Sequence, residues 1–165
     1  MVAKRKRIRL GLLTRKYNFS MNSYPEFRFS KCPDCENKTG QRTLPLMIHI
    51  DPQRFIVLNY TCRYCKKCDM LIAHKHEIEH HLTELFQQID KDVIGNKYLV
   101  FGTVEKKVYN KHLNCPKSFD EIRQHVHDFK SYQIIQMRMG GWFQEGAIQP
   151  IMEFPPSTEW VKQEE

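Results

Sequence analysis

Closely spaced cysteines constrain the fold of this chain more than any other feature of its sequence. Five of them form three CxxC steps: Cys32, Cys35, Cys62, Cys65 and Cys68. A CxxC turn places two thiolates on one side of a tight loop, and two such turns can surround one ion with four sulfur ligands. Tetrahedral sulfur ligation suits zinc, with iron as the redox-active alternative. The spacing therefore predicts a metal centre, and we expect one structural Zn²⁺ ion.

Five cysteines for four ligand positions leave two pairings open. Cys32 and Cys35 are completed either by Cys65 and Cys68, after 29 intervening residues, or by Cys62 and Cys65, after 26. We predict the first set, because Cys62 can then be an ordinary strand residue, and Cys62 stays open as an alternative ligand. A closed four-thiolate site has no free position for a substrate, so we expect the metal to have a structural role.

The segment between the two cysteine groups has the pattern of a β-hairpin. Apolar residues alternate with other types at Leu44, Leu46, Ile48 and Ile50. Residues 55–60 are rich in β-formers, and the turn signal Asp51-Pro52-Gln53-Arg54 lies between the two stretches. With cysteine pairs at both ends, residues 30–70 resemble a zinc ribbon, a module frequent in transcription and translation proteins. Residues 61–74 are similar to a group of uncharacterised bacterial zinc-ribbon proteins, which implies a fold and no known activity.

The rest of the chain predicts an α+β fold. Residues 71–89 carry an apolar stripe at helical spacing, which predicts a long amphipathic helix with Ile78, Leu82, Leu85, Phe86 and Ile89 on its buried face. A small strand–helix–strand unit is expected next, with strands at 98–104 and 132–139. Its helix, over residues 119–130, would begin at the capping-box pattern Ser118-Phe119-Asp120-Glu121.

These patterns divide the chain into four expected segments. Residues 1–31 form a basic and aromatic N-terminal arm, and residues 32–70 form the zinc ribbon. An α+β body over residues 71–149 packs on the ribbon, and an irregular tail rich in Pro and Glu follows over 150–165.

The positive charge of the chain is concentrated at its N-terminus. Lys and Arg total 26 and Asp and Glu total 19, which gives a net charge of +7. Seven of the basic residues lie in the first sixteen positions, which hold no acidic residue: Lys4, Arg5, Lys6, Arg7, Arg9, Arg15 and Lys16. Each cation that neutralises a phosphate releases counterions, so this arm predicts binding to nucleic acid or a ribonucleoprotein. The other readings are a solubilising terminus or attachment to an anionic membrane surface.

A second metal-like pattern lies in the predicted long helix. His76-Glu77-Ile78-Glu79-His80 matches HExxH, which in zinc hydrolases places two imidazoles on one helical face beside a catalytic carboxylate. On a helical wheel His76 and His80 face away from the apolar stripe, and nothing downstream marks a third ligand. We therefore expect a solvated face and keep a zinc hydrolase as the third functional hypothesis.

The remaining features narrow the function without naming it. No apolar run approaches the roughly 20 residues that cross a bilayer, and no secretory signal pattern is present, so we expect a cytoplasmic protein with no membrane association. No phosphate loop, dinucleotide fingerprint or nucleophile elbow is found. The leading hypothesis is a non-catalytic zinc-ribbon binding module that associates with nucleic acid or a nucleoprotein complex. A protein–protein adaptor in a larger assembly is the alternative.

Overall fold

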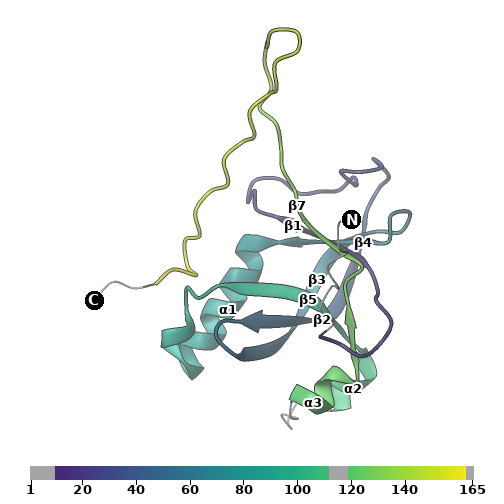
Figure 1. Cartoon of the computed structure of the whole chain (residues 1–165), viewed down its shortest axis with the longest axis vertical. Coiled ribbons are helices and arrows are strands. Elements are labelled where there is room, and N and C mark those ends of the chain that lie inside the picture. The colour runs from purple at the N-terminus through teal and green to yellow at the C-terminus, as the bar shows by residue number, and fades with distance from the viewer. Residues whose placement is uncertain (1–9, 112–118, 163–165) are drawn as a thin grey trace, which may run out of the picture.

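One curled sheet organises the part of the chain that the computed structural model describes, residues 10–111 and 119–162. Seven strands of this part pair in the order β6-β5-β2-β3-β4-β1-β7 and form a half-barrel (Figure 1). Their bounds are β1 (Asn18–Asn22), β2 (Gly40–Ile50), β3 (Arg54–Cys65), β4 (Met70–His74), β5 (Tyr98–Val104), β6 (Val126–Asp128) and β7 (Ser131–Ile134). The helices are α1 (Lys75–Ile89), the 3₁₀ turn η1 (Lys91–Val93), α2 (Lys106–Lys111) and α3 (Phe119–Arg123). The prediction of a mixed fold is confirmed, whereas the arrangement of its elements differs.

The predicted hairpin forms the centre of this sheet. β2 and β3 pair antiparallel from Gly40 opposite Tyr64 to Ile50 opposite Arg54, so both strands are longer than the sequence pattern indicated. β5 pairs with the other edge of β2, and β4 with the other edge of β3. The hairpin is therefore embedded in a larger sheet, where neighbouring strands satisfy its backbone groups.

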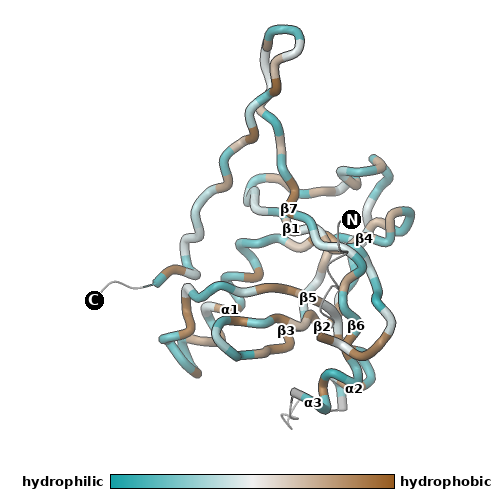
Figure 2. The backbone as a smooth tube through the Cα atoms, viewed as in Figure 1, coloured by the Kyte–Doolittle hydropathy of each residue, from teal (hydrophilic) through white to brown (hydrophobic). Residues whose placement is uncertain are grey.

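The long helix begins later than predicted. Residues 70–74 form β4, because their backbone groups pair with β1 on one side and with β3 on the other. The helix α1 therefore starts at Lys75, and Ile78, Leu82 and Phe86 are fully buried against the sheet. Two residues of the predicted apolar stripe, Leu85 and Ile89, are exposed instead. Figure 2 shows hydrophobic residues concentrated along the central strands that face this helix.

The predicted strand–helix–strand unit is only partly correct. β5 occupies the expected strand, but the helix expected over residues 119–130 ends at Arg123. Val126 belongs to β6, which pairs with β5, so sheet pairing replaces the predicted helix at this point. The last strand is also shorter than expected, since β7 ends at Ile134. The capping residue Ser118 and the isolated Cys115 lie outside the described residues.

Segments from both ends of the chain complete the core. β1 comes from the predicted N-terminal arm and runs parallel to β4 and β7, and Phe19 within it is fully buried. From the predicted irregular tail, Trp160 is buried and its indole N–H donates to the Asn96 carbonyl at 2.7 Å. Between β7 and Trp160 the chain runs away from the sheet and returns as an extended segment (Figure 1). Within the described ranges no helix is long and apolar enough to span a bilayer.

Candidate metal centre

Two loops bring the cysteine pairs to the same place. The first loop follows Lys31 and closes on itself, because the Cys32 N–H donates to the Asn37 carbonyl and the Glu36 N–H donates to the Cys32 carbonyl, both at 2.8 Å. The second loop is the turn between β3 and β4, and Cys65 is the last residue of β3. Glu36 and Asp69 adopt positive φ angles of 63° and 50°, a backbone conformation that turns the chain sharply.

The four sulfurs of these loops form one compact group. Cys32, Cys35, Cys65 and Cys68 place their Sγ atoms within 4.8 Å of one another. The Cys35–Cys65 sulfur distance is 3.4 Å, and the Cys32–Cys68 distance is 3.9 Å. Zinc–sulfur bonds of about 2.3 Å in a tetrahedron require sulfur–sulfur distances of about 3.8 Å. The cluster is therefore consistent with one metal ion such as Zn²⁺.

The cluster lies in a partly buried environment. Cys32 and Cys65 are buried, Cys35 and Cys68 are half-buried, and Met70 packs against them. The backbone N–H of Asn37, aimed at its sulfur, is the main cause that lowers the pKa of Cys35 to about 7. A hydrogen bond to the Cys35 sulfur, together with partial burial, raises the pKa of Cys68 to about 12. Metal ligation requires thiolates, so a bound cation would displace the proton that Cys68 otherwise keeps.

Cys62 lies apart from this cluster. It is buried in the main core, and burial together with the nearby Glu77 carboxylate raises its pKa to about 12. Cys62 and Cys65 are three positions apart on β3, and residues separated by an odd number of positions point to opposite faces of a strand. Because β3 continues through Cys65, it places these two thiols on opposite faces. The odd spacing is visible in the sequence, but it excludes Cys62 only when the strand is known to extend to Cys65.

The polar side chains of the HExxH segment of α1 do not converge on one point. His80 Nδ1 lies 2.9 Å from the Glu159 carboxylate, and its Nε2 lies 3.2 Å from Glu84. Glu77 accepts a hydrogen bond from the Tyr60 hydroxyl at 2.5 Å. The Nε2 atom of His76 is buried and has no hydrogen-bond partner among the described residues. Within the same part of the chain, the four cysteines are the only group of three or more His, Cys, Asp or Glu side chains with clustered ligand atoms.

Two of the seven basic arm residues lie in the described part of the chain. Arg15 donates to the Phe129 carbonyl at 3.3 Å. Lys16 lines a pocket of about 430 Å³ together with three cations that sequence reasoning missed, Arg42, Lys106 and Lys107. We call these four residues the basic pocket. The adjacent Lys106-Lys107 pair was the only sequence signal for it. The other predicted arm residues lie outside the described residues: Lys4, Arg5, Lys6, Arg7 and Arg9.

Comparison with known proteins does not identify a family. No protein-family model, curated protein sequence or solved structure matches the chain. Of the zinc-ribbon resemblance, the structure supports the four-cysteine cluster. The strands next to this cluster belong to a larger, seven-stranded sheet. The function is therefore argued from geometry and charge alone.

Proposed function

We propose that this chain is a non-catalytic binding module, stabilised by one structural zinc ion, that associates with nucleic acid or a nucleoprotein complex. The observation that carries the proposal is the basic pocket. Lys16, the last basic residue of the N-terminal arm, lies there beside Arg42, Lys106 and Lys107. The cationic arm therefore leads directly to a cationic surface of the folded body.

The four cations of the basic pocket form no ion pair within the described residues. In the described ranges Lys75 and Lys130 pair with carboxylates, whereas the four cations of the basic pocket have no carboxylate oxygen within 4.0 Å. Glu105 is the one acidic side chain that lines the pocket. When nucleic-acid phosphates bind these cations, the counterions condensed on the nucleic acid are released. The affinity should therefore fall steeply as the salt concentration rises.

Arg42 is held in place before any ligand binds. Its guanidinium lies 4.0 Å from the centre of the Tyr64 ring and donates to the Tyr17 hydroxyl at 3.1 Å. A guanidinium fixed in this way loses less conformational freedom on binding, and its remaining N–H groups can form a bidentate contact with a phosphate. The pocket thus combines one fixed guanidinium with three lysines.

The proposed role of zinc is to hold the two cysteine loops against the sheet. A site with four thiolate ligands leaves no coordination position for a substrate, which favours a structural function. We place the protein in the cytoplasm, where thiols stay reduced and available to the metal.

Salt-dependent binding tests this proposal. Fluorescence anisotropy of the full chain with single-stranded RNA and DNA of about 20 nucleotides should show tight binding at low salt. Replacing Lys106 and Lys107 by Gln should reduce the slope of log K against log salt by about 1.4, since each lost phosphate contact contributes about 0.7 for single strands. Replacing Lys4, Arg5, Lys6, Arg7 and Arg9 by Gln should reduce it by up to about 3.5.

A matched control separates the basic pocket from net charge. The Lys91→Gln, Lys97→Gln double variant loses the same charge at η1 and the chain before β5, outside the pocket lining. It should retain the wild-type slope. Equal losses in the two double variants, or no binding of either nucleic acid at low salt, would contradict the proposal.

One observation favours the alternative function of a protein–protein adaptor. The extended segment after β7 exposes large apolar side chains, with Trp142 fully exposed and Ile148 83% exposed. Exposed apolar groups of this size mark protein contacts more often than contacts with phosphate. An adaptor predicts a stable partner that survives nuclease treatment and is lost in a Trp142→Ser, Ile148→Ser variant. The nucleic-acid module predicts loss of the associated material on nuclease treatment.

A further inference from the structure

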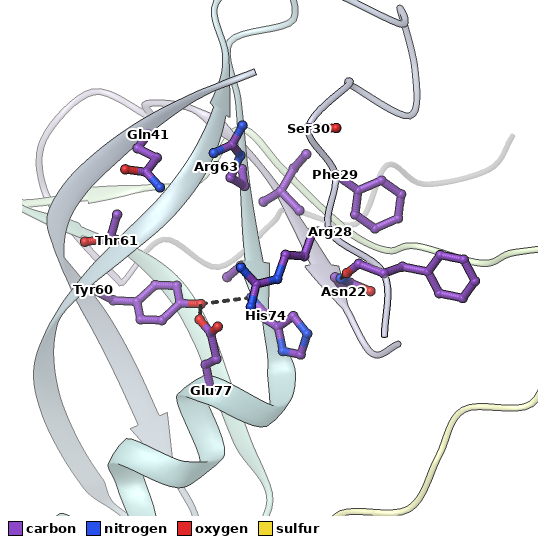
Figure 3. Close-up of a pocket in the computed structure, with 13 residues that line it drawn as sticks. Asn22, Arg28, Phe29, Ser30, Gln41, Tyr60, Thr61, Arg63, His74 and Glu77 are labelled. Carbon is purple, nitrogen blue, oxygen red and sulfur yellow. Dashed lines mark hydrogen bonds between the residues drawn. The ribbon is translucent and has the colours of Figure 1, made fainter. Parts of the chain in front are cut away.

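A polar pocket opens where two neighbouring strands of the sheet separate. β3 pairs with β4 only from Arg63 opposite Ile72 to Cys65 opposite Met70. Beyond this point the His74 N–H donates to the Tyr60 hydroxyl at 3.2 Å instead of to a strand carbonyl. The opening has a volume of about 240 Å³, and we call it the β3–β4 pocket (Figure 3). The residues used below are among its lining: Arg28, Ser30, Gln41, Arg63, His74 and Glu77.

Two guanidinium groups line the β3–β4 pocket. Arg63 is fixed, because its Nε donates to the Thr39 hydroxyl at 3.1 Å and its Nη2 donates to the Thr39 carbonyl at 3.0 Å. Arg28 belongs to the loop after β1, is exposed, and extends across the opening toward the His74 side (Figure 3). The pocket therefore has one fixed cation and one that is free to close on a ligand.

These two arginines form no ion pair within the described chain. Arg54, by comparison, lies 3.6 Å from the Asp90 carboxylate. Neither Arg28 nor Arg63 has a carboxylate oxygen of a described residue within 4.0 Å. Uncompensated cations that share a concave polar site favour an anionic ligand, since the ligand replaces solvent with charge-assisted hydrogen bonds.

The one carboxylate in the pocket is already engaged. Glu77 accepts the Tyr60 hydroxyl at 2.5 Å and lies in the first turn of α1, where the helix N-terminus offsets part of a negative charge. In Figure 3 Glu77 and Tyr60 lie at one end of the pocket, and Arg63, Gln41 and Ser30 lie toward the other. A ligand anion is therefore expected near Arg63, Gln41 and Ser30. The exposed Arg28 side chain, whose head group lies at the Glu77 end in Figure 3, would turn toward the anion to contact it.

The size of the pocket limits the ligand. Its volume of about 240 Å³ corresponds to about eight water molecules at roughly 30 Å³ each. Pockets for drug-sized ligands begin at roughly 300 Å³, so this pocket suits a smaller group. We infer that the β3–β4 pocket binds a terminal phosphate monoester. Its two negative charges match the two guanidinium groups, and its three free oxygens can accept from both arginines and from the Ser30 and Gln41 donors. A phosphodiester within a strand offers one charge and two free oxygens.

The phosphate can belong to the end of a nucleic-acid strand or to a free phosphate compound. Binding of the end of a nucleic-acid strand rests on the proposed function, whereas binding of a free phosphate monoester does not. The two sources are separated by measuring oligonucleotides of about 10 nucleotides with 5′-phosphate, 3′-phosphate or hydroxyl ends, beside inorganic phosphate and a ribonucleoside monophosphate. Anisotropy reports the oligonucleotides, and calorimetry reports the small ligands.

We expect one terminal phosphate to strengthen oligonucleotide binding by about tenfold, which corresponds to about 1.4 kcal/mol and to the gain from one charge-assisted hydrogen bond. Arg28→Gln should abolish this difference and should leave folding intact, because Arg28 is exposed. Glu77→Gln should instead strengthen phosphate binding, because it removes a negative charge and keeps an acceptor for Tyr60. Lys97→Gln, outside the pocket lining, should leave the difference unchanged.

The outcomes of this experiment distinguish the inference from the proposed function. If oligonucleotides with all three kinds of end bind equally, with normal salt dependence, the inference is overturned and the proposed function stands. If inorganic phosphate or the monophosphate binds in an Arg28-dependent way while no oligonucleotide binds, the inference stands and the proposed function fails. A terminal-phosphate preference that persists in Arg28→Gln also overturns the assignment to this pocket.

Discussion

In the cysteine cluster, four sulfurs from two loops lie within 4.8 Å of one another. Of the four polar side chains of the HExxH segment, three contact separate neighbours, and the Nε2 atom of His76 has no hydrogen-bond partner among the described residues. His80 pairs with Glu159 and Glu84, Glu77 binds Tyr60, and Glu79 binds Tyr98. The cluster is consistent with one shared metal ion. The polar side chains of α1 connect this helix to β3, β5 and the C-terminal segment.

The two sequence patterns differ in how many ligands of a metal site each one supplies. Two CxxC turns supply all four ligands of a tetrahedral site. To form the site, the fold needs only to bring the two loops together at one end of a hairpin. HExxH supplies two ligands and leaves the third to a distant segment. In this fold the acidic residue that reaches His80 from a distance is Glu159, and it forms an ion pair with that histidine at 2.9 Å.

The largest expected effect is loss of the metal. Cys65→Ala removes one of the four ligands, so zinc content measured by mass spectrometry should fall from one ion per chain to none. Structural zinc supplies on the order of 10 kcal/mol of folding free energy, and domains of this size are stable by about 5–15 kcal/mol, so the circular dichroism of this variant should show extensive unfolding.

Two controls place this effect in the cluster. Cys62→Ala is the same substitution three positions earlier and should retain one zinc, with a loss of about 1–2 kcal/mol for the buried sulfur. A His76→Gln, His80→Gln variant should also retain one zinc. If the wild-type chain bound a second zinc ion that disappeared with these histidines, the HExxH segment of α1 would be a metal site after all.

An intermediate effect is expected inside the helix interface. Glu79 is 3% exposed, its Oε2 accepts from the Tyr98 hydroxyl at 2.7 Å, and its Oε1 has no hydrogen-bond partner among the described residues. Tyr98→Phe removes the hydroxyl and should lower the free energy of unfolding by about 1–3 kcal/mol, measured by urea denaturation in saturating zinc.

The matched control is Tyr132→Phe at an exposed ring, for which we expect a change within about 0.5 kcal/mol. Equal stability of Tyr98→Phe and the wild type would show that this buried carboxylate does not depend on Tyr98.

The smallest effect is a pH dependence at the helix surface. The hydrogen bond and charge of Glu159, with a further contribution from Glu84, raise the pKa of His80 above its usual value near 6.5. A raised pKa in the folded state contributes stability that is fully present below the unfolded pKa and is lost as pH rises through the folded pKa. The difference in melting temperature between wild type and His80→Gln should therefore be larger at about pH 5.5 than at about pH 8.5.

Zinc binding also varies with pH, but it varies equally in the two proteins, so only their difference is interpreted. A difference that stays constant over this range would show that the His80–Glu159 pair contributes no pH-dependent stability.

Local patterns predicted those elements whose partners are close in sequence. Alternation over residues 44–50 and the turn at 51–54 identified β2 and β3, because a hairpin needs only its own two strands. The stripe of Ile78, Leu82 and Phe86 identified the buried face of α1. The predictions failed where distant pairing overrides local preference. Residues 70–74 became a strand between β1 and β3, and Val126 joined β6.

Local sequence patterns were enough to predict four or five thiols spaced for one metal ion, a hairpin between them, and a cationic N-terminus. The tertiary structure decided which thiols meet, because the extension of β3 through Cys65 turns Cys62 toward the core and Cys65 toward the other loop. It also decided that Arg42, Lys106 and Lys107 join Lys16, and that Arg28 and Arg63 share one pocket. Such groups are assembled by strand order and strand separation, which depend on contacts between residues far apart in the chain.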